Sequence, residues 1–244
     1  MKLRAFALAA LLIFALIFAG SAVRAQAPGA GPPIDLALVL AVDASGSVNQ
    51  TRFDLQKHGY AEAFRSKDVV DAILAGADRA IAVAMVQWTG PSLHVQAIDW
   101  TRISDAASAR ALSEAIDASH RALCGGGTSL SGAIDTGVAM LAANPFRATR
   151  RVIDISGDGS NNSGRLVETA RDEAVKAGIT INGLPITWIE PGLDAYYRSN
   201  VIGGAGAFVI SIDSYDNFAE AILHKLVTEI AGKARPSLAS KAPR

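Results

Sequence analysis

The most apolar stretch in the chain after the first thirty residues is "IDLALVLAV", residues 34–42, and polar positions do not alternate with apolar ones along it. This pattern is typical of a strand that is covered on both faces, as the central strands of parallel sheets are. Comparable apolar runs follow between turn residues and helical segments. They predict further strands at 79–88, 150–159, 179–187 and 206–213, and a shorter, more polar strand at 93–100 that suits a sheet edge.

Segments with helical periodicity separate these strands. In residues 49–65, three- and four-residue steps separate Phe53, Gln56, Tyr60 and Phe64, and this spacing predicts an amphipathic helix. A second clear case begins at Ser104, which has the residue type of a helix N-cap. The remaining helical segments are expected at 67–78, 128–144, 164–178 and 217–233, and the N-capped one extends over 104–123.

Strands that alternate with helices over most of the chain predict an α/β fold. We expect a three-layer, doubly wound and mostly parallel sheet with helices on both faces. Ligands of such sheets bind at the carboxyl ends of the strands. The loops that follow the strands are therefore the place to look for function.

The first residues have the pattern of a secretory signal. Lys2 and Arg4 precede sixteen apolar residues at 5–20, and small residues follow at Ala25 and Ala27. A retained membrane anchor is the alternative, because sixteen residues approach the roughly 20 that span a bilayer. We favour a signal peptide over residues 1–25, cleaved near Ala25 to Ala27, and an exported, soluble product without a later membrane span.

The rest of the chain divides by composition. A linker rich in proline and glycine is expected at 26–33, one domain at 34–232, and a disordered tail without an apolar face at 233–244. Loss of residues 1–25 removes three basic residues and no acidic one, so the mature chain has 20 basic and 23 acidic residues. This balance argues against a nucleic-acid partner. Cys124 is the only cysteine, which excludes an intramolecular disulfide, and a small buried residue is the favoured interpretation over a reactive thiol.

Short oxygen-bearing side chains gather in three loops that follow strands or precede helices. They are "DASGS" at 43–47, "GGGTS" at 125–129 and "SGDGSNN" at 156–162, and none of them contains histidine or cysteine. Hydroxyl and carboxylate oxygens suit magnesium, manganese or calcium. The small number of such groups favours an octahedral ion, Mg²⁺ or Mn²⁺. Asp154, by contrast, lies in the middle of a predicted strand and is expected to be a hydrogen-bonded structural acid, with a role near the metal as the alternative.

The order of these three loops resembles the metal-ion-dependent adhesion site of von Willebrand factor type A (VWA) domains. The resemblance covers residues 34–232: an Asp-x-Ser-x-Ser loop, a threonine after a glycine turn, and an aspartate after a later strand. It implies that Ser45 and Ser47 bind the ion directly, that Thr128 binds it directly or through water, and that Asp43 and Asp158 act through bridging waters. The residues expected around these ligands are Gly127, Ser129, Ser156 and Asn161.

Several segments resemble, more narrowly, an uncharacterised branch of bacterial VWA-like proteins known as a domain of unknown function. They are "RRVIDISGDGSNN", "ITINGLPI" and "VIGGAGAFV". Together with the signal peptide, this resemblance implies a location in the periplasm or outside the cell. Gly157, between Ser156 and Asp158, departs from better-studied VWA domains, in which a threonine or serine directly precedes the aspartate.

A divalent ion held by hydroxyls and two carboxylates keeps an open coordination position that an acidic group of another protein can fill. We therefore expect a non-catalytic binding module whose unknown protein partner offers a Glu or Asp. A magnesium-dependent hydrolase or phosphatase is one alternative, but position 45 is serine where that chemistry places a second acid. The other alternative is a degenerate VWA scaffold without metal. The partner's identity and the oligomeric state are not predicted.

Overall fold

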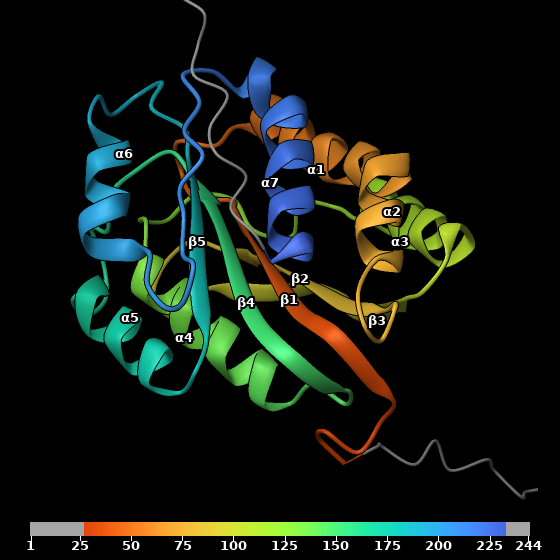
Figure 1. Cartoon of the computed structure of the whole chain (residues 1–244). Coiled ribbons are helices and arrows are strands. Elements are labelled where there is room, and N and C mark those ends of the chain that lie inside the picture. Colours follow the sequence, from red (N-terminus) through yellow and green to blue (C-terminus); the bar gives the residue numbers. More distant parts are fainter. Residues whose placement is uncertain (1–26, 233–244) are drawn as a thin grey trace, which may run out of the picture.

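Five strands form a single sheet in the order β3-β2-β1-β4-β5 (Figure 1). The structure is a computed structural model that describes residues 27–232, so the expected signal peptide (1–25) and tail (233–244) lie outside the described residues. β1 pairs in parallel with β2 and β4, β4 in parallel with β5, and only β3 runs antiparallel, at the edge. The strands are β1 (Pro33–Asp43), β2 (Ile81–Trp88), β3 (His94–Ile103), β4 (Arg147–Gly157) and β5 (Thr180–Pro185).

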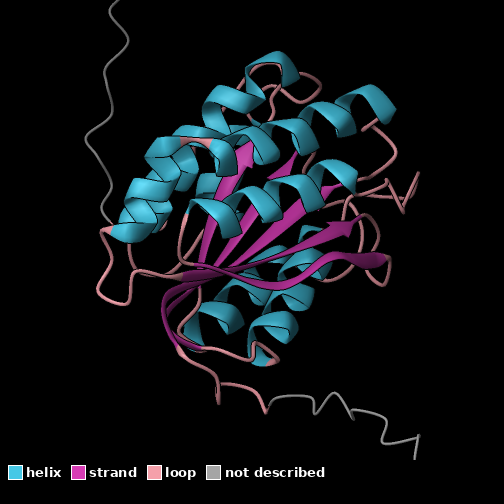
Figure 2. Cartoon of the chain, turned by 90° about the vertical axis from the view of Figure 1, so that its right-hand side faces the viewer, coloured by secondary structure: helices cyan, strands magenta, loops and turns pink. Residues whose placement is uncertain are grey.

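Helices cover both faces of this sheet (Figure 2), which confirms the predicted α/β architecture. β1 shows why: Leu36, Leu38 and Leu40 pack on one helical layer, whereas Val39 and its alternating neighbours pack on the other, and all are buried. The first layer consists of α1 (Gln50–Arg65), α2 (Lys67–Leu74), α3 (Ala106–Ala118) and α7 (Phe218–Ala231). The second consists of α4 (Leu130–Ala142), α5 (Val167–Lys176), α6 (Leu193–Tyr196) and the π-helical turn η1 (Tyr197–Val201).

Helix starts follow the capping chemistry, with one difference from the expectation. Asn49 caps α1, since its side-chain oxygen accepts a hydrogen bond from the Arg52 amide at 2.9 Å. Asp105, rather than the expected Ser104, caps α3, because its carboxylate accepts from the Ser108 amide at 2.7 Å while the Ser108 hydroxyl accepts from the Asp105 amide at 3.2 Å. This reciprocal pair is a capping box, and it satisfies two backbone amides at the start of the helix.

The predicted strand at 206–213 is wrong as a regular strand. The segment lies beside β5 and forms only isolated bridges to it. The amides of Gly183 and Thr187 donate to its carbonyls at 3.1 and 2.8 Å, but Pro185, midway between them, has no N–H to donate. The proline therefore interrupts the ladder and leaves an irregular edge.

The stretch between β5 and this edge segment contains α6 and η1, which the sequence pattern did not predict. Both elements are short, and they bury Leu193, Tyr197 and Val201 against the second helical layer. The hydroxyl of Tyr197 lies next to Gly157, the last residue of β4, and therefore close to the site described below.

Residues 27–32 do not form helix or strand, and Pro33 belongs to β1 rather than to the expected linker. The amides of Gly29 and Gly31 donate to carbonyls of the turn between α4 and β4, at 2.9 and 2.7 Å. Within the described range, no helix has the length and apolar character needed to cross a membrane.

Candidate metal site

The site lies where β1 and β4, parallel neighbours at the centre of the sheet, reach their carboxyl ends. Asp43 is the last residue of β1, and Asp158 directly follows β4. The Ser47 hydroxyl donates to Asp158 Oδ1 at 2.5 Å, and the Ser45 and Ser47 hydroxyls lie 3.2 Å apart. The Asp158 amide in turn donates to Asp43 Oδ2 at 3.4 Å. Four of the five proposed ligands therefore form one hydrogen-bonded cluster.

Thr128, the fifth, comes from the glycine loop before α4. That loop contacts the first one directly, because the Gly46 amide donates to the Gly126 carbonyl at 3.2 Å. The Thr128 amide donates to the side chain of Asn162 at 2.8 Å. A β-carbon placed on Gly159 would lie 3.4 Å from Thr128 Oγ1, so the threonine hydroxyl is beside the residue that follows Asp158. The three loops thus meet at one edge of the sheet.

Two glycines are required by this close packing. A β-carbon on Gly157 would lie 3.0 Å from Asp43 Oδ2 and 3.1 Å from the Tyr197 hydroxyl, and either contact is tighter than side chains normally make. Gly126 has φ +92°, a left-handed conformation, and a β-carbon there would collide with Thr89. Gly157, the departure from the usual VWA pattern, therefore leaves space for the Asp43 carboxylate.

The electrostatics of the cluster centre on Asp43, which is fully buried. Burial and, next, the negative charge of Asp158 raise the pKa of Asp43 from 3.8 to about 7. The Ser45 amide, which donates to Asp43 Oδ1 at 2.7 Å, opposes this rise only in part. A divalent cation beside the two carboxylates would offset both causes.

The residues expected around the ligands hold the loops in place. The Ser156 hydroxyl donates to Gln56, whose side-chain amide donates to the Asp43 carbonyl, both at 3.1 Å. Ser129 caps α4 through the Gly132 amide, and Asn161 accepts from the amide of Ser131, both at 3.1 Å. The space at Gly127 is limited by the side chains of Asn162 and Ser163. Each of these contacts positions backbone rather than pointing a free oxygen at the cluster.

Sequence reasoning missed three residues at this site. The Tyr215 hydroxyl donates to Asp158 Oδ2 at 2.9 Å, and burial, followed by the charge of Asp158, raises the pKa of Tyr215. Arg52 donates to the Ser47 carbonyl at 2.6 Å and lies over the Tyr215 ring, 5.6 Å from its centroid. Arg121 donates to the Ala44 carbonyl at 3.1 Å. Tyr215 and Arg52 each follow a predicted strand-end loop by a few residues, and that position was the available signal.

The donor set of the cluster fits a hard cation. It offers three hydroxyls and two carboxylates, with no nitrogen or sulfur donor among them. Elsewhere in residues 27–232, no group of three or more His, Cys, Asp or Glu side chains is placed to hold a metal. Ser45, Ser47 and Thr128 are the residues that would hold the ion, and this role stays a prediction.

A second cluster of ionisable side chains lies in the core between β4 and α7. Lys225, fully buried, contacts Asp154 Oδ1 at 2.6 Å and Glu229 Oε1 at 2.5 Å. Burial, followed by the charge of Asp154, raises the pKa of Glu229 to about 7. Asp154 is therefore a structural acid, as expected. Its partner, the buried Lys225, was not anticipated. The signal was present, since Lys225 and Glu229 lie four residues apart on the apolar face of the last helix.

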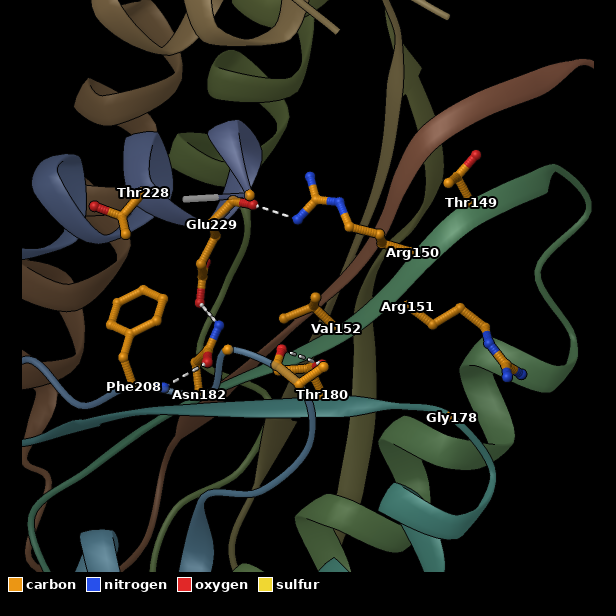
Figure 3. A pocket seen from close by; sticks show the side chains of 13 residues that line it. Thr149, Arg150, Arg151, Val152, Gly178, Thr180, Asn182, Phe208, Thr228 and Glu229 are labelled. Atoms are coloured by element: carbon orange, nitrogen blue, oxygen red, sulfur yellow. Dashed lines mark hydrogen bonds between the residues drawn. The ribbon is translucent and has the colours of Figure 1, made fainter. Parts of the chain in front are cut away.

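Next to this cluster is a pocket of about 250 Å³ between the first residues of β4 and β5 and the end of α7 (Figure 3). Glu229 accepts from the Asn182 side chain at 2.8 Å there, and Arg150 donates to the Glu229 carbonyl at 2.7 Å. The pocket lies at the amino-terminal ends of β4 and β5, opposite to the metal-site loops.

Cys124 is exposed, so the expectation of a buried cysteine is wrong. The residue lies in the irregular segment between α3 and α4, which runs over the surface toward the glycine loop. Its neighbour Leu123 packs against the core, whereas the thiol of Cys124 faces solvent.

Comparisons with known proteins agree with this architecture. The family model described as "Protein of unknown function (DUF1194)" matches residues 33–234. A comparison with curated protein sequences found no significant match.

Among solved structures, the chain is similar to proximal thread matrix protein 1 of the mussel byssus with a zinc-occupied MIDAS motif, at 17% identity and TM-score 0.58, over 85% of this chain and 47% of that one. It is also similar to the pilus adhesin SpaC of Lactobacillus rhamnosus GG, at 15% identity and TM-score 0.59, over 84% of this chain and 31% of that one.

The fold is that of the VWA domains, as the three loops predicted. Within this class, the chain belongs to the DUF1194 family, whose model spans most of it. The chain corresponds to less than half the length of each of the two similar structures. At these identities the structures show the shared fold, and what the site binds is a matter for proposal.

Proposed function

We propose that this protein is a metal-dependent binding module that captures an acidic group of a protein partner. The observation that carries the proposal is the convergence of three loops, distant in sequence, on one cluster of hydroxyls and carboxylates. Ser47 touches Asp158, 111 residues away, at 2.5 Å. In this proposal, Ser45, Ser47 and Thr128 hold Mg²⁺ or Mn²⁺, and Asp43 and Asp158 act through water.

The charges of the site support capture of an anion. Serine and threonine hydroxyls are neutral ligands and the two carboxylates act through water, so no anionic group of the chain contacts the ion directly and it still attracts a further carboxylate. Arg52 and Arg121 add positive charge, because both donate to carbonyls of the 44–47 loop. The bound ion supplies a Lewis-acidic centre, and the chain supplies its orientation through the Ser47–Asp158 and Tyr215–Asp158 hydrogen bonds.

Capture experiments with matched variants test this function. Immobilised wild-type protein, Thr128→Ala and Thr128→Ser are exposed to envelope extract with Mg²⁺ or with chelator. We expect partners to be retained by the wild type and by Thr128→Ser, which keeps the hydroxyl, and to be lost with Thr128→Ala or chelator. Equal retention in all arms contradicts metal-mediated capture, and so does turnover of a phosphate ester that Asp43→Ala abolishes.

We also propose that the protein is exported and acts in the periplasm or outside the cell. The charged and apolar pattern of residues 1–25 supports this, together with the small residues at Ala25 and Ala27. Cell fractionation and N-terminal sequencing test it. A mature chain that begins just after one of these alanines is expected, and an intact N-terminus in the cytoplasmic fraction contradicts it.

A further inference from the structure

The large apolar side chains that are exposed in residues 27–232 all belong to the metal-site edge of the sheet. We call them the apolar rim. Its members are Leu93, Val95, Leu166, Trp188 and Ile189, with exposed fractions from 38% to 73%. Scattered exposed apolar residues are ordinary, but a set confined to one edge of the sheet marks an interaction surface.

Each part of the rim is joined to a site loop by hydrogen bonds. The Thr89 amide donates to the Leu93 carbonyl at 2.9 Å, and the Thr89 carbonyl accepts from Ser129, next to Thr128, at 2.8 Å. On another side, Glu190, which follows Trp188 and Ile189, accepts from the Ser160 amide at 2.8 Å.

Leu166 is placed in the same way on the third side. The side chain of Asn161 donates to the carbonyl of Arg165, the neighbour of Leu166, at 3.1 Å. The turn between β2 and β3, the segment after β5 and the residue before α5 therefore each carry an exposed apolar side chain and are hydrogen-bonded, directly or through a neighbouring residue, to a loop of the metal site.

We propose that the partner of the metal site is a protein segment in which a Glu or Asp is flanked by large apolar side chains. This inference rests on the proposed function, because the carboxylate is assigned to the metal. The positive charges of the cation, Arg52 and Arg121 attract the acidic residue of the partner. The apolar rim buries the apolar side chains that flank this residue in the partner. Trp188 contributes most, since it is 62% exposed and an aromatic ring offers a large contact area.

A displayed peptide library with a fixed central Glu and randomised flanks tests the inference, beside a matched library with a fixed Gln. With wild-type protein and Mg²⁺, we expect enrichment of Leu, Ile, Phe and Trp next to the Glu, and no enrichment from the Gln library. An enriched peptide, made synthetically, is expected to bind the double variant Trp188→Ser, Ile189→Ser about tenfold more weakly, the equivalent of about 1.4 kcal/mol. Lys67→Ser, at an exposed position on α2 away from the rim, is the control and should bind as the wild type does.

The outcomes separate this inference from the function on which it rests. Selection of Glu peptides with polar flanks, or unchanged affinity in the double variant, overturns the apolar-flank inference and leaves metal-mediated capture intact. No enrichment from the Glu library, or enrichment that persists with chelator or with Thr128→Ala, overturns both.

Discussion

Asp43→Asn should stabilise the metal-free protein at pH 8 while abolishing metal binding. Burial and the charge of Asp158 raise the pKa of Asp43 from 3.8 to about 7 in the folded chain. The folded state therefore holds this proton more tightly than the unfolded state does, and the free energy of unfolding falls as the pH rises from about 4 to about 7. A rise of about three pKa units corresponds to about 4 kcal/mol of lost stability at pH 8.

The variant removes this pH-dependent loss because asparagine does not ionise. In urea titrations with chelator, the stability of Asp43→Asn relative to the wild type should be about 4 kcal/mol more favourable at pH 8 than at pH 4. Part of the gain at pH 8 is offset if the new amide faces the Asp158 amide, which now donates to Asp43 Oδ2. Comparing the two pH values cancels that contribution.

The same titration of Asp43 should appear in metal binding. An ion must displace the Asp43 proton below pH 7, so affinity for Mg²⁺ should fall about tenfold for each pH unit below that value. Calorimetry at pH 8, 7 and 6 measures both the affinity and the protons released. Asp71→Asn, a change at an exposed carboxylate on α2, serves as the control and should alter neither quantity. A relative stability that is the same at pH 4 and pH 8, or metal affinity independent of pH, would refute the electrostatic account of Asp43.

Three further substitutions test separate parts of the structure. Lys225→Met should destabilise the fold by about 3–5 kcal/mol in chemical denaturation at pH 8, because Asp154 and Glu229 lose their buried cation; a loss below about 1 kcal/mol contradicts this. Gly157→Ala should lower the free energy of unfolding by about 1–3 kcal/mol, because the new methyl group overpacks against Asp43, and should weaken Mg²⁺ binding in calorimetry. A variant with the stability and Mg²⁺ affinity of the wild type would show that the space beside Asp43 is not needed. Tyr215→Phe removes only the hydroxyl that donates to Asp158, so we expect an altered Mg²⁺ affinity and a change of about 1 kcal/mol in the free energy of unfolding. If the variant binds Mg²⁺ as the wild type does, Tyr215 has no role in the site.

The sheet and the loops of the site could be predicted from the sequence for a physical reason. Central strands covered on both faces are continuously apolar, and parallel strands place their carboxyl ends at one edge, so Asp43 and Asp158 had to lie close once β1 and β4 paired. The 206–213 segment was misjudged because its own pattern is apolar, while the interruption comes from Pro185 in the neighbouring strand.

Contacts that depend on tertiary packing could not be predicted from local sequence patterns. Tyr215 reaches Asp158 only because the segment before α7 crosses the end of the sheet, and no local pattern encodes that crossing. The burial of Lys225 depends likewise on Asp154 from another element. A charged residue on the apolar face of a helix indicates a buried partner of opposite charge, since an unpaired buried charge is costly.

The most direct test of the metal site is a crystal structure grown with Mn²⁺, with the ion located by its anomalous scattering. We expect a Mn²⁺ ion within about 2.1–2.2 Å of the Ser45 and Ser47 hydroxyls, with water between the ion and the carboxylates of Asp43 and Asp158. A well-ordered structure without an ion at this position at saturating Mn²⁺, or with the ion bound elsewhere, would contradict it.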